Sequence, residues 1–391
     1  MPFHERTLVM LREEFVELAG RERANMSELC RYFGIARRTG YRWLRRYQAA
    51  GSVGLLERSR RPLRSPAQTA PEVEQAILAL RQAHPTWGGR KLAARLRALG
   101  HTDVPAASTV TAVLRRHGLL DGPGVGEPRA FRRFEHAAPN ALWQMDFKGH
   151  VACGTGRCHP LTVLDDHSRY NVALQACADE RTATVRDALV AAFRAHGLPE
   201  RIAVDNGAPW GDREGSPYTP LGVWLLRLGV RVAHSRPYHP QTLGKDERFH
   251  RTLKAEVLHH PLLDLVDAQQ RFDRWRQVYN HERPHEALGD AVPAARYRPS
   301  GRSYPERLPA LEYEPGDMVR MVQAKGLTHL RGRVFALPKA FRGHPVAFRP
   351  TTQDARYQVV FATFQIAEID LATSERGVSH VSAHMAPISP V

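Results

Sequence analysis

The chain has 391 residues, of which 42% are hydrophobic and 25% charged, a balance typical of a chain that buries more than one globular core. No apolar run approaches the ~20 residues of a membrane-spanning helix, and four cysteines in so long a chain argue against a disulfide scaffold and favour a reducing compartment. The net charge is +16, and residues 1–140 carry 24 Lys and Arg against 13 Asp and Glu. This basic N-terminal third predicts a polyanionic partner, for which DNA, RNA and an anionic membrane all qualify.

The first predicted element is a helix–turn–helix unit. The stretch SELCRYFGIARRTGYRWLRRYQ predicts one helix from about Ser27 that ends before Gly34, and a second from about Ala36 to Gln48. Arginines recur along the second helix, so we expect it to enter the major groove of DNA, although a small bundle with a solvated basic face is the alternative. Gly40 is a local conflict, because glycine inside a helix costs ~1 kcal/mol against alanine. The expected DNA contacts of this unit are Arg37, Arg38 and Arg42.

A second helical unit of the same kind is predicted after a basic, proline-containing linker. Apolar residues recur at helical spacing in three stretches, and Gly118 is expected to end the third. These apolar residues are Ile77, Leu78 and Leu80, then Leu92, Leu96 and Leu99, then Val110, Val113 and Leu114. The linker could lie along phosphates or be plainly solvated. The expected DNA contacts are Arg60 and Arg61 in the linker and Arg90, Lys91, Ser108, Thr109 and Arg115 in the unit.

The character of the chain changes after a stretch rich in Gly and Pro, in which Arg132 and Arg133 are further expected DNA contacts. Strand-like runs then alternate with helices, which predicts an α/β domain with a mixed sheet. Short β-type runs separated by turns follow, and they predict a small antiparallel β-barrel. The predicted order is helical unit 1–56, linker 57–70, helical unit 71–121, linker 122–140, α/β domain 141–298, linker 299–311, barrel 312–375 and tail 376–391.

Three carboxylates stand out in the α/β domain. Asp146 lies in the strand-like run LWQMDFKGH, Asp205 follows the apolar run RIAV, and Glu247 lies in the first turn of a helix that Gly244 opens. A carboxylate beside a buried strand is costly unless something pairs with it, and three together would raise one another's pKa. Mg²⁺ removes this repulsion and prefers carboxylate, water and phosphate oxygens as ligands. Separation along the chain does not by itself show that the three carboxylates meet.

Five segments carry a resemblance to a known family. They are WQMDF, PLTVLDDHSRY, VDNGAP, RPYHPQTLGKDERFHRTLK and YNHERPHEALG. In this order and spacing they resemble the integrase catalytic core of retroviral integrases and insertion-sequence transposases, the "D,D,E" enzymes of RNase H-like fold. The most specific run is P-Y-x-P-Q-x-x-G-x-x-E, which ends at Glu247 and assigns the third acid to that residue rather than to Asp246. The flanking regions are similar to the helix–turn–helix arm and the small SH3-type barrel found beside such cores.

The resemblance implies a transposase that binds the terminal inverted repeats of an insertion sequence and cuts and joins DNA strands. Asp146 on the first strand and Asp205 after the fourth would hold two Mg²⁺ ions, for which Mn²⁺ can substitute, and Glu247 would complete the second metal site. The implied partners are double-stranded DNA, as element ends and as target, and further copies of the chain in a dimer or tetramer on that DNA. The implied location is the bacterial cytosol, at the nucleoid.

Side chains around Glu247 are expected to hold the DNA strand end. His250, Arg251 and Lys254 would share its helix face, where a solvated basic face is the alternative. The loop before the helix would close over the DNA through Tyr238, His239 and Gln241, or serve only as a connection.

The sequence also contains other candidate site residues and is compatible with two other functions. Asp165 and Asp166 are expected in a structural turn, and Cys153, Cys158 and His159 lack a second ligand pair for zinc. A non-catalytic, sequence-specific DNA-binding regulator derived from a transposase would also use the helix–turn–helix units, but it has no need of three carboxylates. A nuclease for RNA–DNA hybrids or junctions would share the fold, but the shape of its substrate requires no sequence-reading arm.

Overall fold

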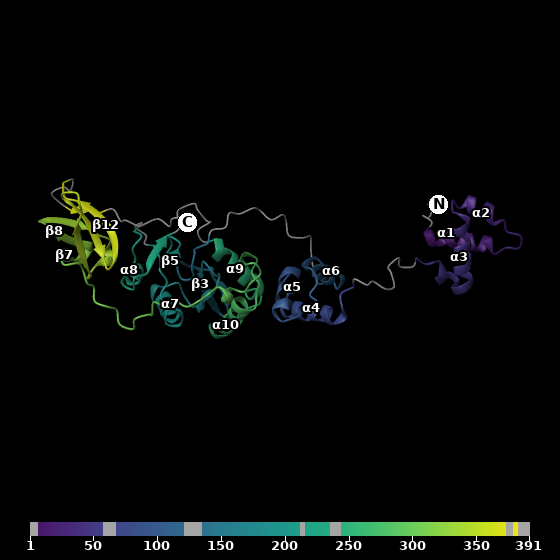
Figure 1. The fold of residues 1–391 in the computed structure, drawn as a ribbon, viewed down its shortest axis with the longest axis horizontal. Helices are drawn as coiled ribbons and strands as arrows, with labels where there is room; N and C mark the ends of the chain where they lie inside the picture. Colours follow the sequence, from purple (N-terminus) through teal and green to yellow (C-terminus); the bar gives the residue numbers. More distant parts are fainter. Residues whose placement is uncertain are drawn as a thin grey trace. The chain divides into compact units, whose positions relative to one another are not determined.

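The computed structural model of the protein describes residues 7–57, 68–120, 135–211, 216–234, 244–372 and 378–381. The chain divides into two compact units, Met1–Gln68 and Thr69–Val391, whose elements are drawn in Figure 1. None of the helices in these described ranges has both the length and the apolar character that crossing a bilayer requires. Some predicted DNA contacts lie outside the described residues: Arg60, Arg61, Arg132, Arg133, Tyr238, His239 and Gln241.

The first unit consists of three helices, of which the second and third are the two that the sequence predicts. They are α1 (Leu8–Ala19), α2 (Met26–Tyr32) and α3 (Arg37–Ala50), followed by the short helix η1 (Gly51–Leu55). The side chains of Thr7 and Asn25 accept hydrogen bonds from backbone N–H groups in the first turns of α1 and α2. These N–H groups have no acceptor inside the helix. Gly34 adopts a φ of +66° in the turn between α2 and α3, as predicted.

Gly40 lies where the three helices of this unit meet. It is buried, and a Cβ atom at this position would lie 2.6 Å from Cys30 Sγ of α2 and 2.8 Å from Phe15 Cζ of α1. The absence of a side chain therefore permits the close approach of α3 to its neighbours. Close packing accounts for a glycine that helix propensity alone disfavours.

The second unit begins with a further three-helix group. Its helices are α4 (Pro71–Ala83), α5 (Gly89–Ala98) and α6 (Ala107–Arg116). Ile77, Leu92 and Val110 are fully buried among them, as their spacing predicts. Leu99 is 51% exposed, against the prediction, because α5 ends one residue before it. Gly118 has a φ of +65° and lies just beyond the end of α6, as predicted.

A six-stranded mixed sheet forms the centre of the second unit. Its strands are β1 (Trp143–Phe147), β2 (Val151–Cys153), β3 (Gly156–Asp165), β4 (Asn171–Cys177), β5 (Arg201–Val204) and β6 (Arg231–His234). The order is β2-β3-β1-β5-β6, with β4 paired to β3. β1 is antiparallel to β3 and parallel to β5, which in turn is parallel to β6. The short strand β2 was not predicted, so Asp205 follows the fifth strand rather than the fourth.

Helices cover both faces of this sheet. They are α7 (Thr182–His196), α8 (Pro220–Arg227), α9 (Gly244–Glu256) and α10 (Leu265–His281). Leu161 and Val163 of β3 share a core with α7 and α8, whereas Leu164 of the same strand shares a core with α9 and α10. This alternation is that of a strand buried on both sides. It puts α9 against the face of the sheet opposite α7.

The C-terminal part consists of two open sheets. One has the order β12-β11-β10-β7 and the other β13-β9-β8, and no pairing among the described strands closes them into the predicted barrel. The strands are β7 (Met318–Met321), β8 (Leu327–Leu330), β9 (Arg333–Ala336), β10 (Pro345–Pro350), β11 (Arg356–Phe361), β12 (Phe364–Asp370) and β13 (Val378–His380). Their common core includes Val223 and Leu226 of α8, so these sheets pack on the central domain.

Candidate active site

Two carboxylates meet at one end of the central sheet. Asp146 lies on β1, and Asp205 directly follows β5. The two strands run parallel, with Gln144 opposite Ala203, so each carboxylate lies two residues beyond this pair. Asp205 contributes to a raised pKa of Asp146, as two neighbouring negative charges require. This part of the predicted carboxylate set is therefore brought together.

Burial makes the charged form of both carboxylates less favourable. Burial, and then the charge of Asp205, raises the pKa of Asp146 to about 6. Burial also raises the pKa of Asp205, although a hydrogen bond from the backbone N–H of Gly207, 3.2 Å from Oδ1, acts in the opposite direction. Within the described ranges, no Lys or Arg forms an ion pair with either carboxylate. Two partly buried acids that form no ion pair with a described Lys or Arg fit a divalent metal ion, because oxygen ligands are those that Mg²⁺ prefers.

The first turn of α9 supplies a further carboxylate near Asp146, but this carboxylate belongs to Asp246 and not to the predicted Glu247. Asp246 is fully buried, and ligand atoms of Asp146, Asp246 and His250 lie within 4.8 Å of one another. Glu247 is exposed and is not part of this group. The motif assignment of the third acid to Glu247 stays a prediction, and Asp246 is the residue that sequence reasoning passed over.

Asp246 and His250 face the sheet rather than solvent. The hydroxyl group of Thr162 on β3 lies 3.1 Å from both carboxylate oxygens of Asp246 and 2.9 Å from Nε2 of His250. Burial, followed by the charge of Asp146, raises the pKa of Asp246 well above its usual value. The sequence spacing indicates that Asp246 faces the core, because it precedes the buried Phe249 and Leu253 by three and seven residues and so shares their helix face.

The predicted DNA contacts on α9 divide between the two sides of the helix. Arg251 and Lys254 are exposed, so a phosphate could reach them. His250 is only 7% exposed, and burial lowers the pKa of its imidazole to about 3. The prediction of an exposed donor at His250 is therefore wrong for this structure, because the side chain packs against Thr162.

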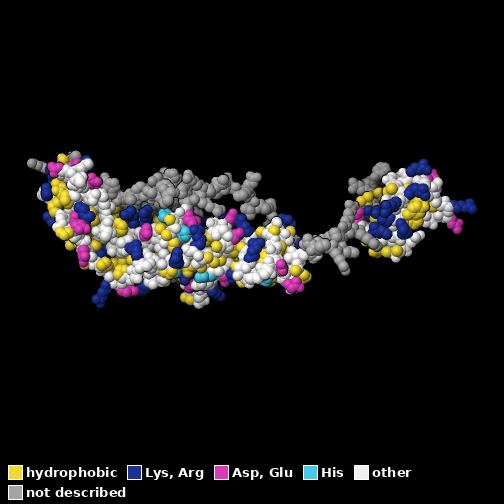
Figure 2. All heavy atoms as spheres, viewed as in Figure 1, with side chains coloured by type: hydrophobic (Ala, Val, Ile, Leu, Met, Phe, Trp, Pro, Cys, Tyr) yellow, Lys and Arg dark blue, Asp and Glu magenta, His cyan; other side chains and the backbone are white. Residues whose placement is uncertain are grey.

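The basic face of the first unit lies on α3. Arg37, Arg38 and Arg42 are exposed there, and Figure 2 shows Lys and Arg side chains gathered on one face of this unit. The guanidinium group of Arg42 lies 5.5 Å from the centre of the Trp43 ring, within the range of a cation–π interaction, and the side chain remains exposed to solvent. These positions agree with the predicted DNA-reading helix.

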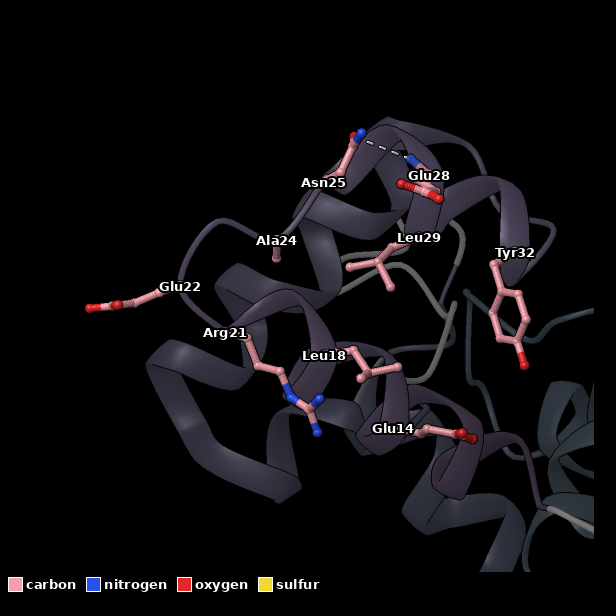
Figure 3. Close-up of a pocket in the computed structure, with 9 residues that line it drawn as sticks. All are labelled: Glu14, Leu18, Arg21, Glu22, Ala24, Asn25, Glu28, Leu29 and Tyr32. Atoms are coloured by element: carbon pink, nitrogen blue, oxygen red, sulfur yellow. Dashed lines mark hydrogen bonds between the residues drawn. The ribbon is translucent and has the colours of Figure 1, made fainter.

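A pocket of about 510 Å³ opens on a different side of this unit, between α1 and α2 (Figure 3). Its wall includes three acidic residues, Glu14, Glu22 and Glu28, against one basic residue, Arg21, and Figure 3 shows Glu22 directed outward from the pocket. Negative side chains of this kind repel phosphate groups, so DNA is expected on α3 and not at this pocket.

The predicted DNA contacts of the second helical group differ in their exposure to solvent. Ser108 and Arg115 of α6 are exposed and Thr109 is half-buried. Arg90 of α5 instead pairs with Glu286 and with Asp290 of the central domain. Lys91 is half-buried beside it, and burial, followed by the charge of Arg283, lowers its pKa to about 8. In this structure the Arg90 and Lys91 side chains are therefore turned towards protein, against the prediction that they face DNA.

The remaining candidates have structural roles. Asp165 accepts hydrogen bonds from the backbone N–H and the hydroxyl of Ser168, which makes the predicted turn. Cys153 and Cys158 are buried in the hairpin of β2 and β3, and neither belongs to a metal-ligand cluster among the described residues. Trp210 is also buried, in the core between the sheet and α7.

Comparison with known protein families finds matches to five parts of the chain. Residues 136–240 and 228–293 match integrase core domains. Residues 11–62 match a helix-turn-helix domain, residues 39–114 a homeodomain-like domain, and residues 317–377 the C-terminal domain of IS481 family transposases. Each of these models matches only part of the chain. The central sheet lies within the matches to integrase core domains, and the N-terminal helices lie within the matches to helix-turn-helix and homeodomain-like domains.

Similar proteins are encoded by insertion elements. An uncharacterized 31.7 kDa protein of insertion element IS407 from Burkholderia multivorans is 30% identical over 165 residues, which are 41% of this chain and 57% of that protein. An uncharacterized 39.2 kDa protein of IS476 from Xanthomonas euvesicatoria is 26% identical over 245 residues, or 61% of this chain and 68% of that protein. The alignment with the IS407 protein thus spans little more than half of its length.

Solved structures similar to the chain include retroviral ones. The simian T-cell lymphotropic virus intasome in complex with the PP2A regulatory subunit B56 gamma aligns with 73% of this chain and 96% of the viral chain, at 18% identity and a TM-score of 0.35. The catalytic core domain of HTLV-2 integrase in complex with magnesium aligns with 41% of this chain and 99% of its own length, at 18% identity and a TM-score of 0.32.

Proposed function

We propose that this chain is an active DNA transposase, a D,D,E polynucleotidyl transferase that cuts and joins DNA at the terminal inverted repeats of an insertion sequence. The observation that carries the proposal is the pair Asp146 and Asp205. Asp146 lies on β1 and Asp205 directly follows the neighbouring parallel strand β5, both carboxylates are desolvated, and no described Lys or Arg forms an ion pair with them. A protein that only binds DNA gains nothing from such a pair, because unpaired buried charges destabilise its fold.

Two divalent metal ions, Mg²⁺ or Mn²⁺, fit the chemistry of these ligands. Asp146 and Asp205 would hold them, and a carboxylate of the first turn of α9 would complete the set. The metal ions would supply Lewis-acid activation of the attacking oxygen and stabilisation of the leaving oxygen. The phosphodiester bond at the element end is hydrolysed to leave a 3′-OH, which then attacks a phosphodiester bond of the target DNA.

Two adjacent residues compete for the third carboxylate position, and we propose Glu247. Its position at the end of the P-Y-x-P-Q-x-x-G-x-x-E run favours it, and its exposure leaves it open to DNA and metal ions. Asp246 lies closer to Asp146, but its carboxylate is already enclosed by Thr162 and His250. Asp246 therefore acts from behind the reactive surface, by packing and hydrogen bonding.

DNA recognition is proposed to use α3 of the first unit and α9 of the central domain. Arg37, Arg38 and Arg42 of α3 would contact the element end in the major groove, and Arg251 and Lys254 of α9 would hold the strand near the carboxylates. Bringing two element ends together requires a dimer or tetramer of the chain on DNA. Chromosomal DNA as substrate places the reaction in the bacterial cytosol, at the nucleoid.

A DNA-binding regulator without catalysis is the second candidate function. The two helix–turn–helix matches at the N-terminal end favour it, because tandem units of this kind are sufficient for sequence-specific binding. The carboxylate pair separates the two candidates, since only the enzyme requires it to remain intact.

The test is cleavage of labelled DNA that carries the flanking ends of the element, with Mg²⁺ present. Three proteins are compared: the native chain, Asp146→Asn, and Asp187→Asn as a matched change of an exposed carboxylate on α7. The transposase proposal expects the native chain and Asp187→Asn to nick at the element end, and Asp146→Asn to bind the DNA without cutting. Specific binding by all three proteins with no cleavage in Mg²⁺ or Mn²⁺ would favour the regulator.

A further inference from the structure

A buried ion pair joins the first turn of α9 to the end of β3. The ammonium group of Lys245 donates a hydrogen bond to Oδ1 of Asp166 and lies 3.3 Å from the carbonyl oxygen of the same residue. Asp166 is 2% exposed, and the Lys245 side chain is 18% exposed. A charged pair this far from solvent is strongly destabilising when only one partner is removed, so it constrains the positions of both segments.

Asp166 also holds the strand that carries Asp146. Its Oδ1 accepts a hydrogen bond of 2.8 Å from the side-chain amide of Gln144, which lies on β1 two residues before Asp146. Its Oδ2 lies 2.9 Å from the backbone N–H of His136 and 3.1 Å from Nδ1 of the same residue. Burial opposes ionisation of this carboxyl, but the hydrogen bonds from His136 and the charge of Lys245 hold its pKa below the ordinary value.

The carboxylate of Asp166 therefore connects the two elements that must supply metal ligands together. Lys245 immediately precedes Asp246 and Glu247, so its ion pair acts together with the Thr162–Asp246 hydrogen bonds to hold the turn that carries both of these acids. The residues that precede α9 in the chain, 235–243, lie outside the described ranges. Phe249 and Leu253 anchor the later turns of the helix in the core, but they do not hold its first turn.

We infer that Lys245 and Asp166 are a positioning pair, which sets the third carboxylate on α9 relative to Asp146 on β1. This inference rests on the proposed metal-dependent function. It assigns Lys245 a role within the protein rather than on DNA, because its ammonium group is directed at a buried carboxylate. Arg248, one turn along the same helix, is exposed and provides a matched cation without such a partner among the described residues.

The test compares Lys245→Met, Asp166→Asn, the double variant, Lys245→Arg and the control Arg248→Met in the full-length chain. Four quantities are measured for each protein: the nicking rate at saturating DNA, the salt dependence of DNA binding, the stability towards urea, and the affinity for Mn²⁺ by calorimetry without DNA. Lys245→Met is expected to nick about 10- to 100-fold more slowly, because a misplacement of ~1 Å costs on the order of 10²-fold in rate. Its DNA affinity and salt dependence should match those of the native chain, and Lys245→Arg should recover most of the rate.

The double variant separates positioning from stability. It contains neither charge, so no uncompensated buried ion remains and its stability should exceed that of either single variant. If the pair positions the carboxylate, nicking stays slow although stability recovers. Recovery of the nicking rate together with stability would overturn the inference. So would a DNA-binding salt slope lower by about one in Lys245→Met, because that result identifies a phosphate contact.

The Mn²⁺ measurement keeps this inference distinct from the proposed function. If the native chain cuts no DNA at all, the transposase proposal fails, and the pair is judged by metal affinity alone. Mn²⁺ affinity about tenfold lower in Lys245→Met and in the double variant, with no change in Arg248→Met, would support positioning of a ligand. Equal Mn²⁺ affinities in all variants would overturn it.

Discussion

Replacement of Asp146 by Asn should stabilise the metal-free protein while it abolishes catalysis. The pKa of this carboxyl rises from 3.8 to about 6 in the folded chain, first because of burial and then because of Asp205. The rise corresponds to about 3 kcal/mol of destabilisation by the ionised group, since one pKa unit is about 1.4 kcal/mol. Because the coupling to Asp205 is included, about 3 kcal/mol is an upper value, and Asp146→Asn should recover about 1–3 kcal/mol near pH 8.

The effect has a defined dependence on pH. The folded state binds the Asp146 proton more tightly than the unfolded state does, so the native chain loses stability as the pH rises from about 4 to 6. Asn does not titrate, and the advantage of the variant should therefore be small near pH 4 and complete above pH 6. Mg²⁺ at about a thousand times its Kd should reverse the order at pH 8, because bound metal then adds about 4.1 kcal/mol and the variant lacks a ligand.

The assay is urea unfolding in EDTA at pH 4 and pH 8, followed by amide hydrogen exchange of β1 and β5 so that this domain is distinguished from the helical units. Asp187→Asn on the exposed side of α7 is the control, and it should change stability equally at both pH values. An Asp146→Asn variant less stable than the native chain at pH 8 without metal would refute the reasoning, because it would mean that the carboxylate has a stabilising partner within the protein.

Two further substitutions test separate parts of the structure. Gly40→Ala should destabilise the first unit by about 1–3 kcal/mol through overpacking against Cys30 and Phe15, and amide exchange in α3 should become faster; slower exchange would mean that helix propensity outweighs the close contact. Glu247→Gln should abolish nicking while DNA binding is retained, whereas Asp246→Asn should keep measurable nicking, at a rate reduced about 10-fold or less if its role is packing. The opposite ranking of these two variants would make Asp246 the third metal ligand.

The helices were predictable because their signals are local. Gly34 marks the turn between α2 and α3, and Gly118 marks the end of α6, since both adopt a positive φ that glycine accepts without strain. Asp146 and Asp205 were predictable as a pair from their positions beside apolar strand-like runs and from the family motif. Their proximity depends on the parallel pairing of β1 with β5, which local sequence does not specify.

The features that sequence reasoning did not reach depend on tertiary contacts. Asp246 was set aside for its neighbour because a motif does not state which side of α9 faces Thr162. Asp166 was expected in a turn, but its bond to Lys245 crosses 79 positions of the chain. The predicted closed barrel required strand pairings that repeated β-type runs do not determine, and the described strands form two open sheets instead.

Strand transfer from a pre-cut DNA end tests the central claim most directly. A labelled duplex that ends at the exposed 3′-OH of the element is mixed with target plasmid and Mg²⁺, and joined products are identified by sequencing. The transposase proposal predicts joined products with the native chain and none with Asp205→Asn, although both proteins bind the duplex. Equal binding by the two proteins with no joining and no nicking, in either Mg²⁺ or Mn²⁺, would contradict it and leave a DNA-binding regulator as the function.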